Sequence, residues 1–321
     1  MRVTLGFDTS CYTTSAAAVN EQGEVVAASR LLLPVKQGER GLRQSEAVFA
    51  HVRQMPLVME DLRKQLDGQD VQVVALCASS APRDEEDSYM PVFTVGLGHA
   101  RVLAAALNVP LYETSHQQGH IAAGLIGNKE PDDVFVALHL SGGTTELLAC
   151  RADSLKLLGG CADLHAGQVV DRVGVSLGLP FPAGPHLEKL AMSCEEPVES
   201  LLPVSMEKDG LTCHLSGVET RAQQWIREGK MSREKIAAEV FDVLARTVAR
   251  LLAGACASSG AHKALVVGGV ASSTLLRSQL QKRLAKQRAK IEVMFGQPRF
   301  SADNAAGVAA IGMKKFLEQH K

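Results

Sequence analysis

The chain has 321 residues, of which 46% are hydrophobic, 21% charged and only 4% aromatic. This length is sufficient for two domains, each with its own hydrophobic core. The formal net charge of -1 at pH 7 excludes a chain whose overall charge drives binding to nucleic acid or to an anionic membrane.

The first third of the chain alternates between strand and helix patterns. Short apolar runs separated by turns predict a three-stranded meander at Val3–Asp8, Ala16–Val19 and Val25–Leu33. A helix is predicted at Ser45–Leu66, a strand at Val71–Ala78, a helix at Thr94–Leu107, a strand near Leu111 and a helix at 115–124. This alternation predicts an α/β fold.

The remainder of the chain repeats the pattern. Strands are predicted at Val134–Leu140, Glu146–Cys150, Leu155–Leu158, 261–270 and 291–295, and helices at 165–178, 184–193, 214–228, 233–258, from Ser272 and from Asp303. The turn SCYTT (10–14) matches SGGTT (141–145), and both lie between apolar strands. The match predicts two related domains that face each other across a cleft, although turn composition alone can produce so short a match.

Two glycine-rich turns are candidate anion sites. SGGTT leaves the backbone N–H groups of Gly142 and Gly143 uncovered and adds the hydroxyls of Ser141, Thr144 and Thr145. VVGGVASS (266–273) leads from a strand into a helix whose N-terminus favours an anion. For each turn, the alternative is that glycine serves backbone geometry alone.

A pair of histidines is the candidate metal site. His116 and His120 are four residues apart, so their imidazoles lie on one face of a helix and can share a cation. An anionic third ligand is required, and Asp303 in FSADNAAG is the best distant candidate. The alternatives are a histidine pair without a metal and an aspartate that only caps the last helix.

Cysteine usage and hydropathy indicate the compartment. The seven cysteines are scattered and include no CxxC pair, which is typical of reduced thiols in the cytosol. No apolar run is long enough to span a bilayer, and Asp8 is reached before any signal-type apolar core develops. The sequence predicts a cytoplasmic protein without a membrane partner.

Seven ordered blocks resemble those of one enzyme family. They are LGFDTSCYTTSAAAV, SHQQGH, VALHLSGGTTELL, VVDRVGVSLGLPFPAGPHLEKLA, LSGVET, LVVGGVASSTLLR and SADNAA. In order and spacing they are similar to the blocks of the TsaD-type tRNA N6-adenosine threonylcarbamoyltransferases, formerly called glycoproteases. The resemblance covers nearly the whole chain. It implies two duplicated ribonuclease-H-like domains of the actin, sugar kinase and heat-shock ATPase type around a nucleotide cleft, with domains at 1–110 plus 300–321 and at 111–299.

The resemblance also implies roles for individual residues. His116, His120 and Asp303 would bind one divalent metal ion, iron(II) or zinc, which would act as a Lewis acid on phosphate or carboxylate oxygens at its open coordination positions. The donor nucleotide, an adenylate or ATP-like molecule, would contact the positions Ser141, Gly142, Gly143, Thr144, Thr145, Asp171, Gly184, Gly268, Gly269 and Ser273. Within this set, Asp171 corresponds to the aspartate that contacts the ribose.

Departures from the family pattern concentrate at the end of the expected cleft where the reaction would take place. The family turn SCDE reads Ser10, Cys11, Tyr12, Thr13 here, so an acidic pair is absent. Thr144 replaces a histidine, and Ser273 replaces a nucleotide-contacting asparagine. The family's AGPGL loop is replaced by the longer, acidic SAPRDEEDSYMPVF (80–93), and GEAFDK by GQVVDR. Lost acid, base or positioning groups can each cost roughly a hundredfold in rate.

Three hypotheses of function follow. The first is a metal-dependent transferase that moves threonylcarbamoyl from its adenylate to N6 of the adenosine beside the tRNA anticodon. The second is a catalytically impaired paralogue that binds metal and nucleotide as a partner or scaffold of a true transferase of the same pathway. The third is a carbamoyl transferase or ATPase with an acceptor other than tRNA.

The basic stretch 276–290 is a candidate tRNA contact or, alternatively, a solvated amphipathic helix with Leu276, Leu280 and Leu284 inward.

Overall fold

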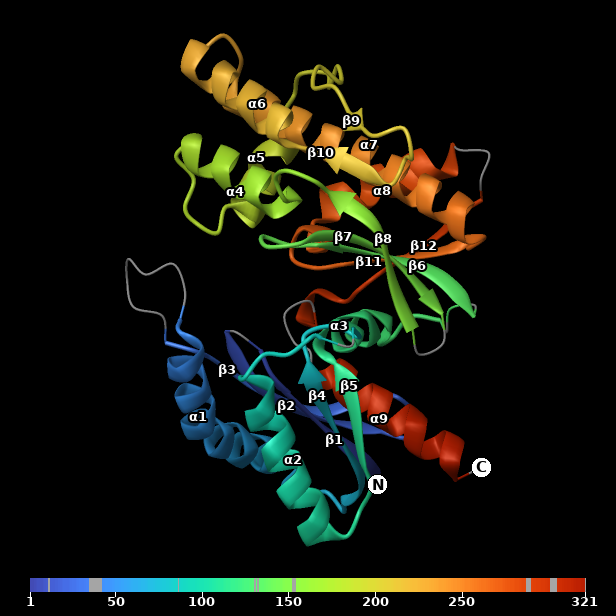
Figure 1. The fold of residues 1–321 in the computed structure, drawn as a ribbon. Coiled ribbons are helices and arrows are strands. Elements are labelled where there is room, and N and C mark those ends of the chain that lie inside the picture. Colours follow the sequence, from blue (N-terminus) through green and yellow to red (C-terminus); the bar gives the residue numbers. More distant parts are fainter. Residues whose placement is uncertain are drawn as a thin grey trace. The chain divides into compact units, whose positions relative to one another are not determined.

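The computed structural model describes residues 1–10, 12–34, 42–85, 87–129, 131, 133–151, 154–286, 290–300 and 305–320. They form two compact units (Figure 1), Met1–Gly127 with Arg299–Lys321, and Asn128–Pro298. Unit 1 extends to Gly127, because the strand and helix that follow residue 110 pack within it. No described helix is both long enough and apolar enough to cross a membrane.

Unit 1 begins with an antiparallel meander and continues with alternating helices and strands. Its elements are β1 (Arg2–Thr9), β2 (Thr13–Asn20), β3 (Val25–Leu32), α1 (Gln44–Gln65), β4 (Gln72–Ala81), α2 (Phe93–Leu107), β5 (Leu111–Ser115), α3 (His116–Leu125) and α9 (Ala305–Gln319). Within the described residues, five strands form a sheet in the order β3-β2-β1-β4-β5, in which β1, β4 and β5 are parallel. The predicted alternation of strands and helices is confirmed.

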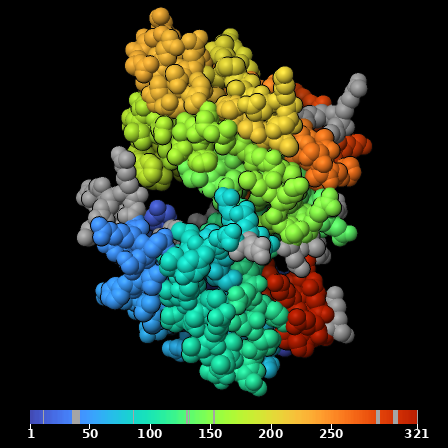
Figure 2. All heavy atoms as spheres, in the orientation of Figure 1, coloured from blue at the N-terminus to red at the C-terminus, as the bar shows by residue number. Residues whose placement is uncertain are grey.

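The two faces of this sheet are covered by different helices. Successive side chains of a strand point to opposite faces. Leu5 and Phe7 of β1 pack with residues of α1 and α2, whereas Val19 of β2 packs with α9. Figure 2 shows α1, in blue, and α2, in teal, at the surface of unit 1. The apolar alternation of the meander thus determines which helices lie on each face.

Helices α3 and α9 pack in backbone contact through two glycines. A Cβ atom at Gly307 of α9 would lie 1.9 Å from the carbonyl oxygen of Gly119 and 2.5 Å from the amide nitrogen of Ala123, both in α3. No side chain fits in that space, so glycine is required. The contact fixes the start of α9 beside the helix that carries His116 and His120.

Replacing Gly307 by alanine is expected to destabilise unit 1. Forcing the extra methyl group between two backbones costs about 3 kcal/mol of unfolding free energy, the upper end of the usual cost of overpacking. Gly98→Ala is the matched control, because it lies in α2 with no atom within 4 Å of its Cβ position. Urea unfolding should show a lower midpoint for Gly307→Ala only, and equal midpoints would contradict the packing described.

Unit 2 has a larger sheet and a long central helix. Its elements are β6 (Val134–Leu140), β7 (Thr145–Arg151), β8 (Ser154–Cys161), α4 (Ala166–Ser176), α5 (Gly184–Met192), β9 (Ser205–Met206), β10 (Thr212–His214), α6 (Ser216–Glu228), α7 (Arg233–Ser259), β11 (Lys263–Val267), a 3₁₀ turn (Val270–Ser272), α8 (Thr274–Ala285) and β12 (Glu292–Phe295). A 3₁₀ turn at Pro298–Phe300 ends the unit. The described strands of this sheet have the order β12-β11-β6-β7-β8-β10-β9.

The strand order of unit 1 recurs in unit 2. The order β8-β7-β6-β11-β12 repeats β3-β2-β1-β4-β5, and in each case two strands run parallel to the first strand of the meander. The first hairpin turns also match, because Ser10 N–H donates to Thr13 O at 3.1 Å and Ser141 N–H donates to Thr144 O at 2.8 Å. This repetition confirms the α/β fold of two ribonuclease-H-like halves and the pairing of SCYTT with SGGTT.

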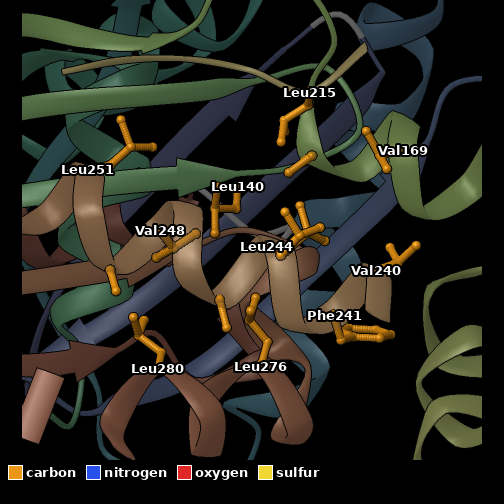
Figure 3. Close-up of a cluster of buried hydrophobic side chains, with 14 of the residues drawn as sticks. Leu140, Val169, Leu215, Val240, Phe241, Leu244, Val248, Leu251, Leu276 and Leu280 are labelled. Carbon is orange, nitrogen blue, oxygen red and sulfur yellow. The ribbon is translucent and has the colours of Figure 1, made fainter. Parts of the chain in front are cut away.

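The core of unit 2 is organised around α7. Figure 3 shows Leu244 and Val248 of α7 between Leu140 of β6 and Leu276 and Leu280 of α8, and all of these side chains are buried. Leu284 is also buried, as the amphipathic pattern of this segment predicts. The short strands β10 and β9, which extend the sheet beyond β8, were not predicted.

Candidate functional site

The SGGTT turn of unit 2 is held by the start of α4. Ala166 N–H donates to Thr145 Oγ1 at 2.9 Å, and Gly167 N–H donates to Ser141 O at 3.2 Å. A Cβ atom at Gly167 would lie 2.6 Å from both Gly142 N and Ser141 O. The positive end of the α4 dipole is therefore directed at the turn, where it favours a bound anion.

The turn presents unbonded backbone donors. Gly142 and Gly143 are exposed, and in the described part of the chain no acceptor receives a hydrogen bond from either N–H group. Thr145 is buried with its hydroxyl bound to α4, so its role is to fix the turn rather than to meet a ligand. Successive free N–H groups over a helix N-terminus suit phosphate oxygens.

The second glycine-rich turn lies against the first. Gly268 has φ +102°, and its Cβ would approach Leu140 O to 2.3 Å, immediately before SGGTT. Gly269 has open space around it. The two turns are thus brought together at the ends of β6 and β11, as strand order predicts for neighbouring strands.

The N-terminus of α8 is already occupied by side chains. Ser273 Oγ accepts from Leu276 N–H at 3.1 Å, and Glu188 Oε1 accepts from Leu275 N–H at 2.8 Å and from the Thr274 hydroxyl at 2.7 Å. The carboxylate of Glu188 therefore accepts hydrogen bonds at the helix N-terminus where the sequence pattern predicts a bound anion. Ser273, buried, acts here as the helix cap.

Asp171 and Gly184 are joined through the segment before α5. Asp171 Oδ1 accepts from Ala183 N–H at 2.8 Å, and Ala183 directly precedes Gly184, the first residue of α5. Gly174, one turn after Asp171, leaves room for Ala183, since its Cβ would lie 2.4 Å from that of Ala183. The carboxylate and the glycine backbone are therefore positioned relative to each other within unit 2.

In unit 1, the two histidine rings of α3 are adjacent. The ring centroids of His116 and His120 lie 4.7 Å apart, and that of Phe93 lies 5.6 Å from His116. Ser115 caps the helix by accepting from Gln118 N–H at 3.1 Å, so α3 begins at His116. The predicted juxtaposition of the two imidazoles is present.

A buried carboxylate that the sequence analysis missed orients His116. Both oxygens of Asp8, at the end of β1, lie 3.0 Å from His116 Nδ1, and Asp8 is 1% exposed. The Ser79 hydroxyl of β4 donates to the same carboxylate. An Nδ1–H facing Asp8 fixes the tautomer in which Nε2 is the metal-binding nitrogen, an arrangement common behind metal-bound histidines. The sequence feature that could have pointed to this role is a single acidic residue, Asp8, at the end of an apolar run.

The substitution Asp8→Asn is expected to weaken metal binding without abolishing it. Loss of a carboxylate behind a metal-bound histidine typically lowers metal affinity by about 10- to 100-fold. Asp84→Asn is the control, since Asp84 also contacts α3 but accepts its hydrogen bond from Gln118 Nε2, at 3.1 Å. Competition titration with a chelator measures the affinity, and equal values for Asp8→Asn and wild type would exclude this positioning role.

The third predicted ligand, Asp303, lies outside the described residues. Within the described ranges, no group of three His, Cys, Asp or Glu side chains is arranged to hold a metal ion. Asp303 precedes Ala305, the first residue of α9, by two positions, and α9 contacts α3 at Gly119 and Gly307. A donor set of two imidazoles and one carboxylate fits iron(II) or zinc.

The first hairpin turn is supported by a buried histidine. His51 of α1 is fully buried, with Nε2 2.8 Å from Ser10 O and Nδ1 2.7 Å from Thr14 Oγ1. Burial lowers the pKa of His51, against the raising effects of the bond to Ser10 and of Asp8. Tyr12 is 52% exposed. Cys11 lies outside the described residues.

Two other segments have specific contacts. The acidic segment 80–93 is attached to α3, because Gln117 N–H donates to Pro82 O at 3.1 Å in addition to the bond between Gln118 and Asp84.

In the basic stretch 276–290, Arg277 donates to Ala271 O and Gly296 O, both at 2.6 Å, and Arg283 pairs with Asp242. These two arginines stabilise unit 2 rather than offering charge to a polyanion.

A cavity of about 500 Å³ lies along α1 and contains none of the candidate residues. Its lining includes Phe49, Arg53 and Leu57.

Comparison with known proteins connects the chain to one sequence family and one fold. The family model described as tRNA N6-adenosine threonylcarbamoyltransferase (TsaD) matches residues 45–310. Full-length HypF in a phosphate- and nucleotide-bound form superposes with a TM-score of 0.61 at 13% identity, covering 98% of this chain and 46% of HypF.

Two further structures match over their whole length. Component A of (R)-2-hydroxyglutaryl-CoA dehydratase from Acidaminococcus fermentans has a TM-score of 0.55 at 15% identity, covering 98% of this chain and 99% of that one. A ROK family glucokinase from Streptomyces griseus, in complex with glucose and AMPPNP, has a TM-score of 0.55 at 13% identity, covering 97% and 99%. At these identities the structural matches establish the fold of the actin, sugar kinase and heat-shock ATPase type.

Proposed function

The chain belongs to the tRNA N6-adenosine threonylcarbamoyltransferase family, and from this we propose that it transfers the threonylcarbamoyl group from threonylcarbamoyl-adenylate to N6 of the adenosine beside the tRNA anticodon, releasing AMP. The observation that carries the proposal is the SGGTT turn, whose exposed Gly142 and Gly143 N–H groups lie over the start of α4. A nucleotide-bound HypF and an AMPPNP-bound glucokinase of the same fold support a nucleotide as ligand.

Unit 2 would hold the donor. The N–H groups of Gly142 and Gly143 would bind the phosphate, with the hydroxyls of Ser141 and Thr144 at the rim and Thr145 fixing the turn. Asp171 would accept hydrogen bonds from the ribose hydroxyls beside the backbone of Gly184. Gly268 and Gly269 would adjoin the nucleotide, and Ser273 would support that turn as the cap of α8.

Unit 1 would hold the metal. His116 and His120 would bind it through imidazole nitrogens and Asp303 through its carboxylate. When bound, the metal supplies a Lewis acid that polarises and orients oxygen atoms of the donor. Asp8 and Ser79 keep the His116 ring in the orientation that this binding needs.

A second candidate function has a specific observation in its favour. The acidic pair of the family turn is replaced by Tyr12 and Thr13, and Thr13 contributes its carbonyl oxygen to closing the turn. Loss of acid or base groups can lower the rate by about 100-fold or more. A chain that binds nucleotide and metal but turns over slowly would serve as a partner or scaffold of another transferase.

Donor consumption distinguishes the candidates. AMP release from threonylcarbamoyl-adenylate is measured with metal-loaded protein at physiological salt, with and without unmodified tRNA. The proposed transferase releases AMP faster when tRNA is present. AMP release that tRNA does not change indicates a different acceptor, and donor binding without AMP release indicates the impaired partner.

A further inference from the structure

Two cysteines of unit 2 lie side by side on neighbouring strands. Cys161 ends β8 and Cys213 is in β10, and these parallel strands place the two residues as direct partners. The flanking hydrogen bonds, from Gly160 N–H to Leu211 O at 2.9 Å and from Ala162 N–H to Cys213 O at 3.0 Å, fix this register. Neighbouring strands are about 4.8 Å apart, within the Cα separation of disulfides.

The two side chains also lie on the same side of the sheet, because directly paired residues of neighbouring strands point to one face. Cys161 itself lies 3.0 Å from Leu164 O and 3.3 Å from Asp163 Oδ1. Cys161 is partly exposed and Cys213 is fully buried. One thiol is therefore open to a reagent, and its neighbour is shielded from it.

The environment makes Cys161 the nucleophile of the pair. Hydrogen bonding to the neighbouring Cys213 thiol lowers the pKa of Cys161 to about 7, while burial opposes this change. The same bond, together with burial, raises the pKa of Cys213. Thiolates, not thiols, attack disulfides, and a thiol whose pKa is near the ambient pH attacks most effectively.

The two cysteines lie next to the segment that leads into α4, the helix whose start contacts the SGGTT turn. Asp163, two residues after Cys161, accepts hydrogen bonds from Leu164 N–H at 2.6 Å and Leu215 N–H at 2.8 Å, and so joins the segment after β8 to the segment after β10. Partial burial opposes ionisation of Asp163, but the bonds from Ser216 and these N–H groups hold its pKa well below the usual range. The joined segment leads directly into α4.

We propose that Cys161 and Cys213 are a redox-active pair that forms a reversible disulfide joining β8 to β10. The Cys161 thiolate attacks a low-molecular-weight disulfide such as glutathione disulfide, forming a mixed disulfide and releasing one glutathione thiolate. Cys213 then loses its proton and, as a thiolate, attacks the Cys161 sulfur, and the second glutathione leaves as a thiolate that takes up a proton from solvent. Two protein thiols are oxidised and one glutathione disulfide is reduced to two glutathiones.

The pair can be mapped directly by peptide analysis. The reduced, full-length protein is incubated with glutathione disulfide, alkylated and cleaved with trypsin without reductant. Cleavage after Lys156, Arg172, Lys208 and Arg221 gives peptides 157–172 and 209–221, each with one cysteine. The expected product is these two peptides linked by a disulfide, which dithiothreitol separates. Oxidised wild type should also unfold at a higher urea concentration than reduced protein.

Variants separate this reaction from general oxidation. Cys161→Ser removes a partly exposed thiol and should abolish both the linkage and the stability shift, and Cys213→Ala should stop the reaction at the glutathione adduct of Cys161. Cys194→Ser, at another partly exposed cysteine, should react as wild type does. A persistent glutathione adduct on wild-type Cys161, or unmodified Cys161 and Cys213, would overturn the proposal.

Discussion

Alanine at His116 or His120 is expected to empty the metal site. Wild-type protein loaded with iron(II) or zinc and desalted should retain close to one metal ion per chain. The two imidazoles, with centroids 4.7 Å apart, supply two of the three proposed ligands. Removing a directly bound imidazole should lower affinity by more than about 100-fold, since loss of a residue behind a ligand already costs 10- to 100-fold.

The metal prediction has a matched control and a further variant. His99→Ala removes an imidazole of α2 whose Nδ1 lies 2.8 Å from Val95 O, and it should leave the metal content unchanged. Asp303→Ala should lose the metal as the histidine variants do. Full metal retention in both His116→Ala and His120→Ala, measured by elemental analysis after desalting, would rule out α3 as the source of ligands.

Alanine at Gly167 is expected to release the SGGTT turn from α4 and to weaken nucleotide binding strongly. Its Cβ would lie 2.6 Å from Gly142 N and Ser141 O, which are backbone atoms and cannot rotate away as a flexible side chain would. Alanine favours a helix over glycine by only about 1 kcal/mol, whereas overpacking costs about 1 to 3 kcal/mol. The turn must therefore shift, and its N–H groups with it.

The expected loss of AMP affinity for Gly167→Ala is about 10- to 100-fold, because each tenfold corresponds to roughly 1.4 kcal/mol. Gly217→Ala is the control, since it lies in α6 with no atom within 4 Å of its Cβ position. Calorimetric titration measures both variants, and circular dichroism checks that each remains folded. A folded Gly167→Ala protein that binds AMP as tightly as wild type would show that the nucleotide lies elsewhere.

Sequence periodicity was sufficient for most of the fold. The meander beginning at Val3–Asp8 and the helices at 233–258 and Ser45–Leu66 have uninterrupted apolar patterns, and all appear in the structure within a few residues of the predicted bounds. The strands β9 and β10 were missed because a strand of two or three residues is too short to show a recognisable period. The strand predicted at 261–270 ends at Val267, where Gly268 adopts a positive φ.

The candidate site was only partly accessible to sequence reasoning. The His116 and His120 pair follows from helical spacing, which is local. The bond between Asp8 and His116 joins residues 108 positions apart, and no local pattern encodes such a contact. Likewise, nothing local indicates that Glu188 accepts a hydrogen bond from the start of α8 or that Gly167 contacts the SGGTT turn, since both depend on the packing of segments distant in sequence.

We propose that this chain converts threonylcarbamoyl-adenylate and tRNA into modified tRNA and AMP. The most direct test of this activity is incubation of metal-loaded protein with the donor and unmodified tRNA, followed by nuclease digestion and mass spectrometry of the nucleosides. The predicted result is N6-threonylcarbamoyladenosine in an amount equal to the AMP released with wild type, and none with His116→Ala. Wild-type protein that binds metal and donor but leaves the adenosine unmodified would contradict the claim.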